Sequence, residues 1–200
     1  MSSKKEAKKE KEKLTWQQSV ILYLHDLLYM LVAVILIFLI FFRIIVVSGD
    51  SMYQTLWDGD YVLLVNNLFA PEPDYGDIVV ISKRSYDNGK PIVKRVIATE
   101  GQTVDIDFES GIVYVDGLAL EEPYINSPTY NNWGSQFPLT VADNCIFVLG
   151  DNRGVSRDSR DPIIGQVDKR EVLGKAIFLM IPGTNHGREP QDMDRMGAIE

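Results

Sequence analysis

Hydrophobic positions divide the chain into one long apolar segment near its start and many short apolar runs after it. Residues 27–42 contain no charged side chain and no recurring polar face, and as a helix they would extend about 24 Å. A bilayer core is roughly 30 Å thick, so residues 20–24 are needed to complete the crossing. We expect a transmembrane helix over 19–43. The alternative, a helix on the core of a soluble protein, would present a polar face to water.

Beyond residue 43 the apolar runs are short and rich in Val and Ile, which is typical of β-strands. The strand candidates are 61–65, 77–81, 91–97, 103–107, 112–115, 146–149 and 176–180. Turn-forming pairs separate several of them, at Asn88-Gly89, Ser110-Gly111 and Asp116-Gly117. The predicted fold class is therefore mainly β, an antiparallel sheet domain over 44–183 that follows one N-terminal transmembrane helix.

Two stretches carry no strand pattern. Residues 118–143 are rich in Pro, Asn, Tyr and Ser and are expected to leave the sheet as an irregular excursion. Residues 184–200 are polar without any period, and we expect a disordered tail there.

The charge is distributed unevenly along the chain. The formal net charge is −8, which argues against nucleic acid as a partner. The basic tail predicted at 1–18 opens with six lysines and three glutamates, so residues 1–14 carry +3 and the remainder carries −11. By the positive-inside rule the tail is cytoplasmic and the β domain extracytoplasmic, with the lipid bilayer as a partner. Residues 43–47 offer no small-residue cleavage site, so the helix is expected to stay as an anchor.

Cysteine and histidine usage excludes several kinds of chemistry. Cys145 is the only cysteine, which rules out an internal disulfide and a cysteine-based metal cluster, and its place at a predicted strand start suggests a core residue. His25 and His186 lie beside the apolar segment and in the polar tail, so a Ser-His-Asp triad is not expected. The acidic residues of 150–160 show no regular ligand spacing. We therefore expect no metal and no other cofactor.

Two residues are candidates for nucleophilic catalysis. Ser51 follows Gly49 in a tight turn that could expose a hydroxyl, although a serine beside glycine is most often only a turn residue. Lys94 lies among apolar neighbours at 92–97, and a desolvated lysine can lose its proton and act as a base. The simpler interpretation of Lys94 is an outward side chain on an edge strand. Likewise, the polar cluster at 150–160 could be an ordinary loop.

Taken together, and in this order after an anchor, these segments resemble the bacterial type I signal peptidases, the leader peptidase family with a Ser/Lys dyad. The similar segments are 48–56, 76–80, 94–97 with Glu100-Gly101, 150–153 with 156 and 158–160, and 174–176. The resemblance extends over residues 20–182. It implies a mostly antiparallel β fold and, as partners, secreted preproteins whose signal peptides end in small residues of the Ala-x-Ala type.

The resemblance also implies a role for each matching residue. Ser51 would be the nucleophile and Lys94 the general base, with Ser156 orienting the lysine amine through a hydrogen bond. Asp158 would pair with Arg95 and Arg160 as part of the scaffold. The walls of shallow pockets for small side chains would come from four apolar residues: Val47, Met52, Leu56 and Ile92.

This sequence departs from the family pattern at two positions. Gln54 stands where the family usually has proline, and Gly49 where some members carry a serine aimed at the oxyanion. The oxyanion hole would then use the Ser51 amide and a second donor that the sequence does not identify. Two other functions share these motifs in part. One is a non-catalytic or dedicated assembly factor for a few surface proteins, and the other is a soluble self-cleaving repressor protease, which would lack the anchor.

Overall fold

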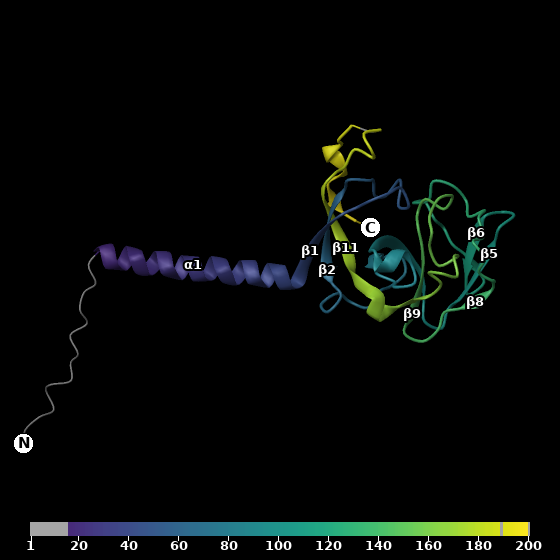
Figure 1. Cartoon of the computed structure of the whole chain (residues 1–200), viewed down its shortest axis with the longest axis horizontal. Helices are drawn as coiled ribbons and strands as arrows, with labels where there is room; N and C mark the ends of the chain where they lie inside the picture. Colours follow the sequence, from purple (N-terminus) through teal and green to yellow (C-terminus); the bar gives the residue numbers. More distant parts are fainter. Residues whose placement is uncertain (1–15, 189, 200) are drawn as a thin grey trace, which may run out of the picture. The chain divides into compact units, whose positions relative to one another are not determined.

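The computed structural model describes residues 16–188 and 190–199 and divides into two units, 1–40 and 41–200 (Figure 1). The first unit holds helix α1, Trp16–Phe41, a segment of 26 residues. Within the described part of the chain it is the one helix long and apolar enough to cross a membrane. At 1.5 Å per residue α1 extends about 39 Å, more than a bilayer core requires. Most of the basic tail expected at 1–18 lies outside the described residues.

The anchor boundary differs slightly from the expected 19–43. The helix begins at Trp16 and ends at Phe41, and strand β1, Phe42–Val46, starts at once. Ile44, Ile45 and Val46 are β-branched and favour extended backbone, but the end of α1 also contains Ile37 and Ile40, so composition alone does not set this boundary. Pairing of all five β1 residues with β2 then fixes the strand.

The larger sheet is antiparallel throughout, as predicted, and its strand order is β1-β2-β11-β3-β4-β9-β10, with β12 also on β11. Its strands after β1 are β2 Tyr61–Asn66, β3 Ile78–Ile81, β4 Ile92–Thr99, β9 Cys145–Leu149, β10 Val167–Asp168, β11 Val172–Ile181 and β12 Gly197–Ala198. A smaller sheet has the order β7-β6-β5-β8. Its strands are β5 Thr103–Asp107, β6 Ile112–Val115, β7 Leu118–Ala119 and β8 Leu139–Thr140. Three 3-10 turns complete the fold: η1 Asp87–Gly89, η2 Lys169–Glu171 and η3 Met193–Arg195.

Each of the predicted apolar runs forms a strand, and the ends differ by at most four residues. The turn pairs take the left-handed backbone conformation that Asn, Asp and Gly tolerate, with φ of 54° at Asn88 and 52° at Asp116. Residues 118–143 form the irregular excursion that was expected, apart from the two-residue strands β7 and β8. Cys145 opens β9 and is partly buried against the core.

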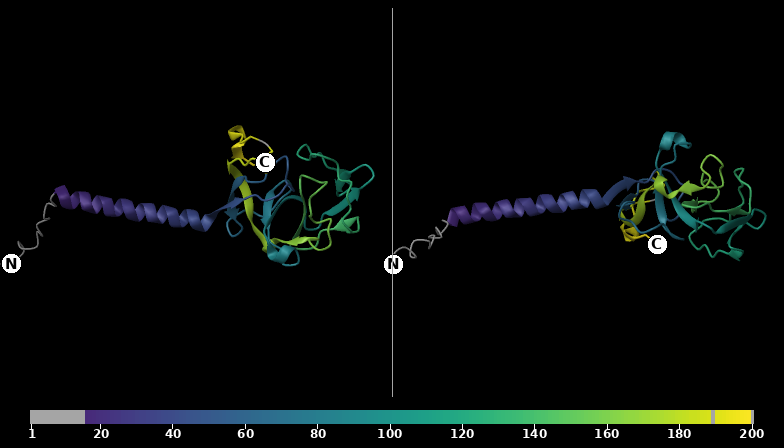
Figure 2. Two further views of the ribbon diagram at one scale, coloured as in Figure 1. Left: turned by 45° about the horizontal axis from the view of Figure 1, so that its top comes forward. Right: turned by 90° about the horizontal axis from the view of Figure 1, so that it is seen from below.

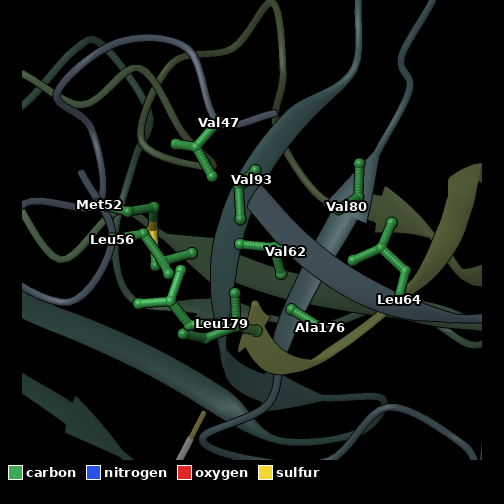
Figure 3. Close-up of a cluster of buried hydrophobic side chains, with 10 residues drawn as sticks. Val47, Met52, Leu56, Val62, Leu64, Val80, Val93, Ala176 and Leu179 are labelled. Carbon is green, nitrogen blue, oxygen red and sulfur yellow. The ribbon is translucent and has the colours of Figure 1, made fainter. Parts of the chain in front are cut away.

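The core cluster next to the functional site lies under the larger sheet (Figure 3). Alternate residues of β2 and β11, such as Val62, Leu64 and Ala176, point into it. Met52 and Leu56 cover it from the loop after β1, and each is 1% exposed. This packing fixes the loop that carries Ser51, because two of its side chains are part of the core.

The prediction of a disordered tail at 184–200 is corrected by the structure. The described residues of this tail return to the sheet, where β12 pairs with β11 and η3 stands next to it. In Figures 1 and 2 the yellow C-terminal segment lies beside β11 from every side shown. Local composition did not indicate this, because the segment is held by pairing with β11 and by contacts with Asp60, which lies more than 100 positions earlier.

Candidate active site

The structure brings the two candidate catalytic side chains into direct contact. Ser51 lies in the loop between β1 and β2, residues 47–60, called here the nucleophile loop, and Lys94 lies in β4. Lys94 Nζ donates to Ser51 Oγ over 2.9 Å and to the carbonyl oxygen of Val93 over 2.8 Å. The Lys94 side chain is 2% exposed, so it is neither on an edge strand nor directed outward.

Burial gives Lys94 the property that a base requires. Desolvation of the ammonium lowers the pKa of Lys94 from 10.5 to about 8, while the carboxylates of Asp158 and Asp151 act in the opposite direction. With a pKa near 8, roughly a tenth of the amine is neutral at pH 7, compared with less than a thousandth for an ordinary lysine. The side chain can therefore accept a proton from Ser51 near neutrality.

The loop after β9 holds the backbone on which Ser51 stands. The Asn152 amide donates to the Ser51 carbonyl over 3.0 Å, and Asn152 Nδ2 donates to the Asp50 carbonyl over 2.9 Å. Gly150 approaches so closely that a Cβ there would lie 2.5 Å from the Ser51 carbonyl oxygen and 2.1 Å from Ser156 Oγ. Glycine is required at this position because any side chain would displace the nucleophile loop.

Arg95 is paired differently from the expectation. Its guanidinium binds Asp151, with Nε to Oδ1 at 3.0 Å and Nη2 to Oδ2 at 2.8 Å, and it lies 4.0 Å from the ring centre of Tyr124. Asp151 also accepts from Thr55 Oγ1 over 2.5 Å. Lys94 and Arg95 are neighbours on one strand, so their side chains point to opposite sides. Through Asp151, Arg95 ties β4 to the nucleophile loop.

Asp158 pairs with Arg160, as the resemblance implies. Both side chains are 0% exposed, and Arg160 Nε and Nη2 each bind the carboxylate over 2.8 Å. Asp158 also accepts from the Gly150 amide over 3.1 Å. The pair therefore supports the glycine that touches Ser51, which is a scaffold role.

Ser156 does not make the expected hydrogen bond to Lys94. Its hydroxyl is buried and has no hydrogen-bond partner among the described residues. The Lys94 amine is directed to Ser51 Oγ and to the Val93 carbonyl instead. The hydroxyl of Ser156 occupies the space that a side chain at residue 150 would need, since a Cβ on Gly150 would lie 2.1 Å from Ser156 Oγ.

A groove of about 670 Å³ opens beside the dyad. Its walls come from residues 45–51 on one side and from 86–87 and 90–94 on the other. Val47 and Ile92 line it, as the resemblance implies, and Ile45 and Val80 add further apolar surface. Met52 and Leu56 are not part of this lining but are buried in the core beneath the loop (Figure 3). That part of the pocket prediction is corrected, since the turn directs these two side chains inward.

Sequence reasoning assigned no role to two residues that position the nucleophile, Asp151 and Asn152. Both belong to the segment 150–153 that resembles the family, so the segment was recognised while its contacts were not. Their roles depend on contacts with residues 50, 51, 55 and 95, which are far away along the chain.

The sequence model of one family, described as signal peptidase, peptidase S26, matches residues 20–181. The chain belongs to the signal peptidase family. It is similar to a probable signal peptidase I-1 of Synechocystis sp., with 37% identity over 71% of this chain and 72% of the relative. It is also similar to signal peptidase I S of Bacillus subtilis, with 32% identity over 87% of this chain and 92% of the relative.

A solved signal peptidase I from Enterococcus faecalis aligns with 52% of this chain and 97% of that chain, at 32% identity and a TM-score of 0.42. The family assignment rests on the sequence matches alone. As a member of this family the chain is a serine peptidase of the signal peptidase I type. The single N-terminal apolar helix fits a membrane-anchored protein.

Proposed function

We propose that this protein is a membrane-bound endopeptidase that removes signal peptides from secreted preproteins by a Ser51/Lys94 mechanism. The observation that carries the proposal is the 2.9 Å contact between Lys94 Nζ and Ser51 Oγ in a buried site. A serine hydroxyl needs a base to become a nucleophile, and the depressed pKa of Lys94 supplies one.

The reaction proceeds in two halves. Lys94 Nζ takes the proton of Ser51 Oγ while Oγ attacks the carbonyl carbon of the scissile bond, and the Ser51 amide N–H is one donor to the oxyanion. The tetrahedral intermediate then breaks its C–N bond, and the Lys94 ammonium returns the proton to the leaving amine. Lys94 next takes a proton from water, whose oxygen attacks the ester on Ser51. Collapse of the second intermediate releases the signal peptide and restores the hydroxyl.

The groove supports a preference for small residues of the Ala-x-Ala type before the cut. Val47, Ile92 and Ile45 bring branched apolar side chains to its walls next to Ser51. A bulky substrate residue would have to displace these walls at a cost of about 1–3 kcal/mol, which lowers the rate by roughly five- to 150-fold. Paired preprotein substrates with Ala-x-Ala and Phe-x-Phe before the cut should therefore differ by at least about fivefold in cleavage rate, and equal rates would refute the pocket.

The anchor supports action at a membrane. Helix α1 is followed by the catalytic unit, and Ser51 stands only ten residues beyond Phe41. The lysine-rich start argues for a cytoplasmic N-terminus and an extracytoplasmic catalytic unit. That placement suits substrates whose apolar signal segment is still held by the bilayer.

The test is incubation of the full chain, purified in detergent, with a model preprotein, followed by N-terminal sequencing of the product. A cut directly after an Ala-x-Ala sequence in the wild type, and none with Ser51→Ala, is the expected result. Binding without cleavage by the wild type would instead indicate a non-catalytic assembly factor. Cleavage of only a few among many preproteins would indicate a dedicated processor.

A further inference from the structure

The described residues past the family match, which ends at residue 181, are packed against the nucleophile loop. We call residues 183–199 the C-terminal clamp; residue 189 within it lies outside the described residues. Its end is fastened to the sheet by β12, with Ala198 opposite Phe178 of β11, and by the Ile199 amide, which donates to the Ile177 carbonyl over 3.1 Å. Residues 197–199 therefore attach the end of the clamp to β11, and the preceding residues of the clamp contact the loop.

The start of the clamp touches the loop backbone to backbone. A Cβ on Gly183 would lie 2.4 Å from the Asp58 carbonyl oxygen, so only glycine fits there. The Gly183 amide donates to Asp60 Oδ1 over 2.6 Å, and the Asn185 amide donates to the Asp58 carbonyl over 3.1 Å. His186 Nε2 lies 3.2 Å from the Asp50 carboxylate and His186 Nδ1 lies 3.2 Å from that of Asp58.

Arg195 makes the second contact, at the same Asp60 carboxylate that the Gly183 amide binds. Its guanidinium donates to both oxygens of Asp60, over 3.1 and 2.8 Å, and to the Thr55 carbonyl over 3.4 Å. The same group lies 3.7 Å from the ring centre of Trp57. The Asp60 side chain is 0% exposed and the Arg195 side chain only 15%. A buried, bidentate pair of this kind is costly to break, because it leaves a carboxylate without its cation.

Asp60 connects Arg195 to the loop that carries Ser51. The Asp60 carbonyl accepts from the Val47 amide over 2.8 Å, and its carboxylate accepts from the Trp57 amide over 2.7 Å, so Asp60 closes the loop that contains Ser51. Asp58 Oδ1 accepts from the Gly49 amide over 2.8 Å, two residues before Ser51. Thr55, whose carbonyl Arg195 binds, reaches the Arg95–Asp151 pair through its hydroxyl.

We propose that the C-terminal clamp positions the nucleophile loop, and that Arg195 is a positioning residue for Ser51. This inference rests on the proposed function, because it assigns Ser51 as the group to be positioned. Arg195 touches neither Ser51 nor the groove, and it acts through Asp60, Thr55 and Trp57. We expect looser positioning to lower the rate of attack more than it weakens substrate binding, because the opposite groove wall, at 86–87 and 90–94, belongs to segments outside the nucleophile loop.

The test compares Arg195→Ala and Arg195→Lys with Arg170→Ala in the full detergent-solubilised chain. Arg170 is a matched control, since it is also paired with an aspartate, but its side chain is 84% exposed and its partner, Asp168, lies outside the nucleophile loop. Two quantities are measured: amide hydrogen exchange in residues 48–59, and kcat and KM for an Ala-x-Ala preprotein. Near-ultraviolet circular dichroism confirms folding.

For Arg195→Ala we expect loop exchange to rise about tenfold or more and kcat to fall about tenfold, with KM changed less than about twofold. Arg195→Lys should lie between wild type and Arg195→Ala, because lysine keeps the charge but loses the bidentate fork. It also serves as the test variant if Arg195→Ala does not fold. Arg170→Ala should match the wild type in both quantities.

Two results would overturn the proposal. One is unchanged loop exchange in folded Arg195 variants. The other is faster loop exchange with unchanged kcat, which would make the clamp a structural contact without influence on Ser51. If the wild type cleaves no preprotein, the proposed function fails, while the exchange measurement still reports whether Arg195 holds the loop.

Discussion

At the scale of single residues, the proposed chemistry depends on Lys94, whose amine must be neutral to accept a proton. Burial at 2% exposure lowers its pKa to about 8, and a contact of 2.9 Å aims it at Ser51 Oγ. A permanently charged side chain at this position could not accept the Ser51 proton. The proposed reaction therefore depends on the ability of Lys94 to change its protonation state.

Lys94→Arg should be almost inactive, although it keeps a positive charge. Guanidinium does not release its proton in proteins, so it cannot serve as a base. We expect a loss of at least about a thousandfold in kcat, and a double variant with Ser51→Ala should be little worse than either single variant, since the pair acts as a unit. Turnover of an Ala-x-Ala preprotein by the folded variant is the measurement. Near wild-type turnover would exclude Lys94 as the base.

The cleavage rate should rise with pH as Lys94 loses its proton. Below the pKa of about 8 most of the amine is charged and unable to accept the Ser51 proton. We expect kcat/KM to increase about tenfold per pH unit well below 8 and to level off above it. Initial rates between pH 6 and 10 give this profile. A midpoint near 10.5, the ordinary lysine value, would contradict the assigned desolvation.

Lys94 should also make stability depend on pH. Below about pH 8 the folded state bears a buried ammonium, and the difference from the ordinary pKa of 10.5 corresponds to roughly 3 kcal/mol. Between about 8 and 10.5 the unfolded chain binds more protons, so wild-type stability rises with pH. Lys94→Met should therefore unfold at higher urea concentration than wild type at pH 7, with an advantage that shrinks toward pH 10.5. An advantage independent of pH would rule out this linkage.

At the scale of elements, the loop after β9 and the nucleophile loop are held together by contact of their backbones. Gly150 permits that contact, and Asn152 binds the carbonyl groups of Asp50 and Ser51. The position of Ser51 relative to Lys94 thus depends on a third segment, which contributes no catalytic group.

Gly150→Ala should displace Ser51. The added Cβ would lie 2.1 Å from Ser156 Oγ and 2.5 Å from the Ser51 carbonyl oxygen, so we expect a loss of about 1–3 kcal/mol in stability and at least tenfold in kcat. Gly154→Ala, in the same loop, is the matched control, because its Cβ would meet only Ser127 Oγ at 4.0 Å. Thermal unfolding and preprotein turnover are compared for the two. Equal effects of both changes would refute the close-approach explanation.

Seven of the twelve described strands, and several of the turns between them, could be predicted from the sequence because their signals are local. In the run 103–107 apolar and polar residues alternate, which predicts a strand. The pair Asp116-Gly117 is typical of a tight turn. Other features depend on distant partners and could not be predicted in this way. Arg95 pairs with Asp151, 56 positions away, and the orientation of Met52 and Leu56 follows from the core formed by β2 and β11. The resemblance identified the segments that form the site. The contacts between their side chains depend on how these segments pack in the folded chain.

At the scale of the whole molecule, an apolar helix and a β-rich catalytic unit follow one another in one chain. The charge asymmetry indicates how the chain is oriented in a membrane, and the tail beyond residue 182 completes the sheet. The packing of the tail could not be predicted from the sequence, since one of its main contacts joins Arg195 to Asp60, 135 positions away.

The catalytic unit should be accessible from outside the cell. The lysine-rich start before one apolar span predicts a cytoplasmic N-terminus. Protease added to intact cells, with outer layers made permeable, should degrade the chain after residue 44 and leave the N-terminal part protected. A cytoplasmic marker protein must stay intact as the control. Full protection of the catalytic unit would reverse the topology.

The strand order has a consequence for how the enzyme is built. Ser51 belongs to the half of the sheet formed by β1 and β2, and Lys94 to the half formed by β3 and β4. The two halves are joined by β11, whose Gly174 pairs with Asn66 at a separation of more than 100 residues. Pairings between such distant segments form slowly during folding, after local hairpins. We therefore expect a partly folded chain to keep Ser51 and Lys94 apart until β11 is inserted between the two halves of the sheet.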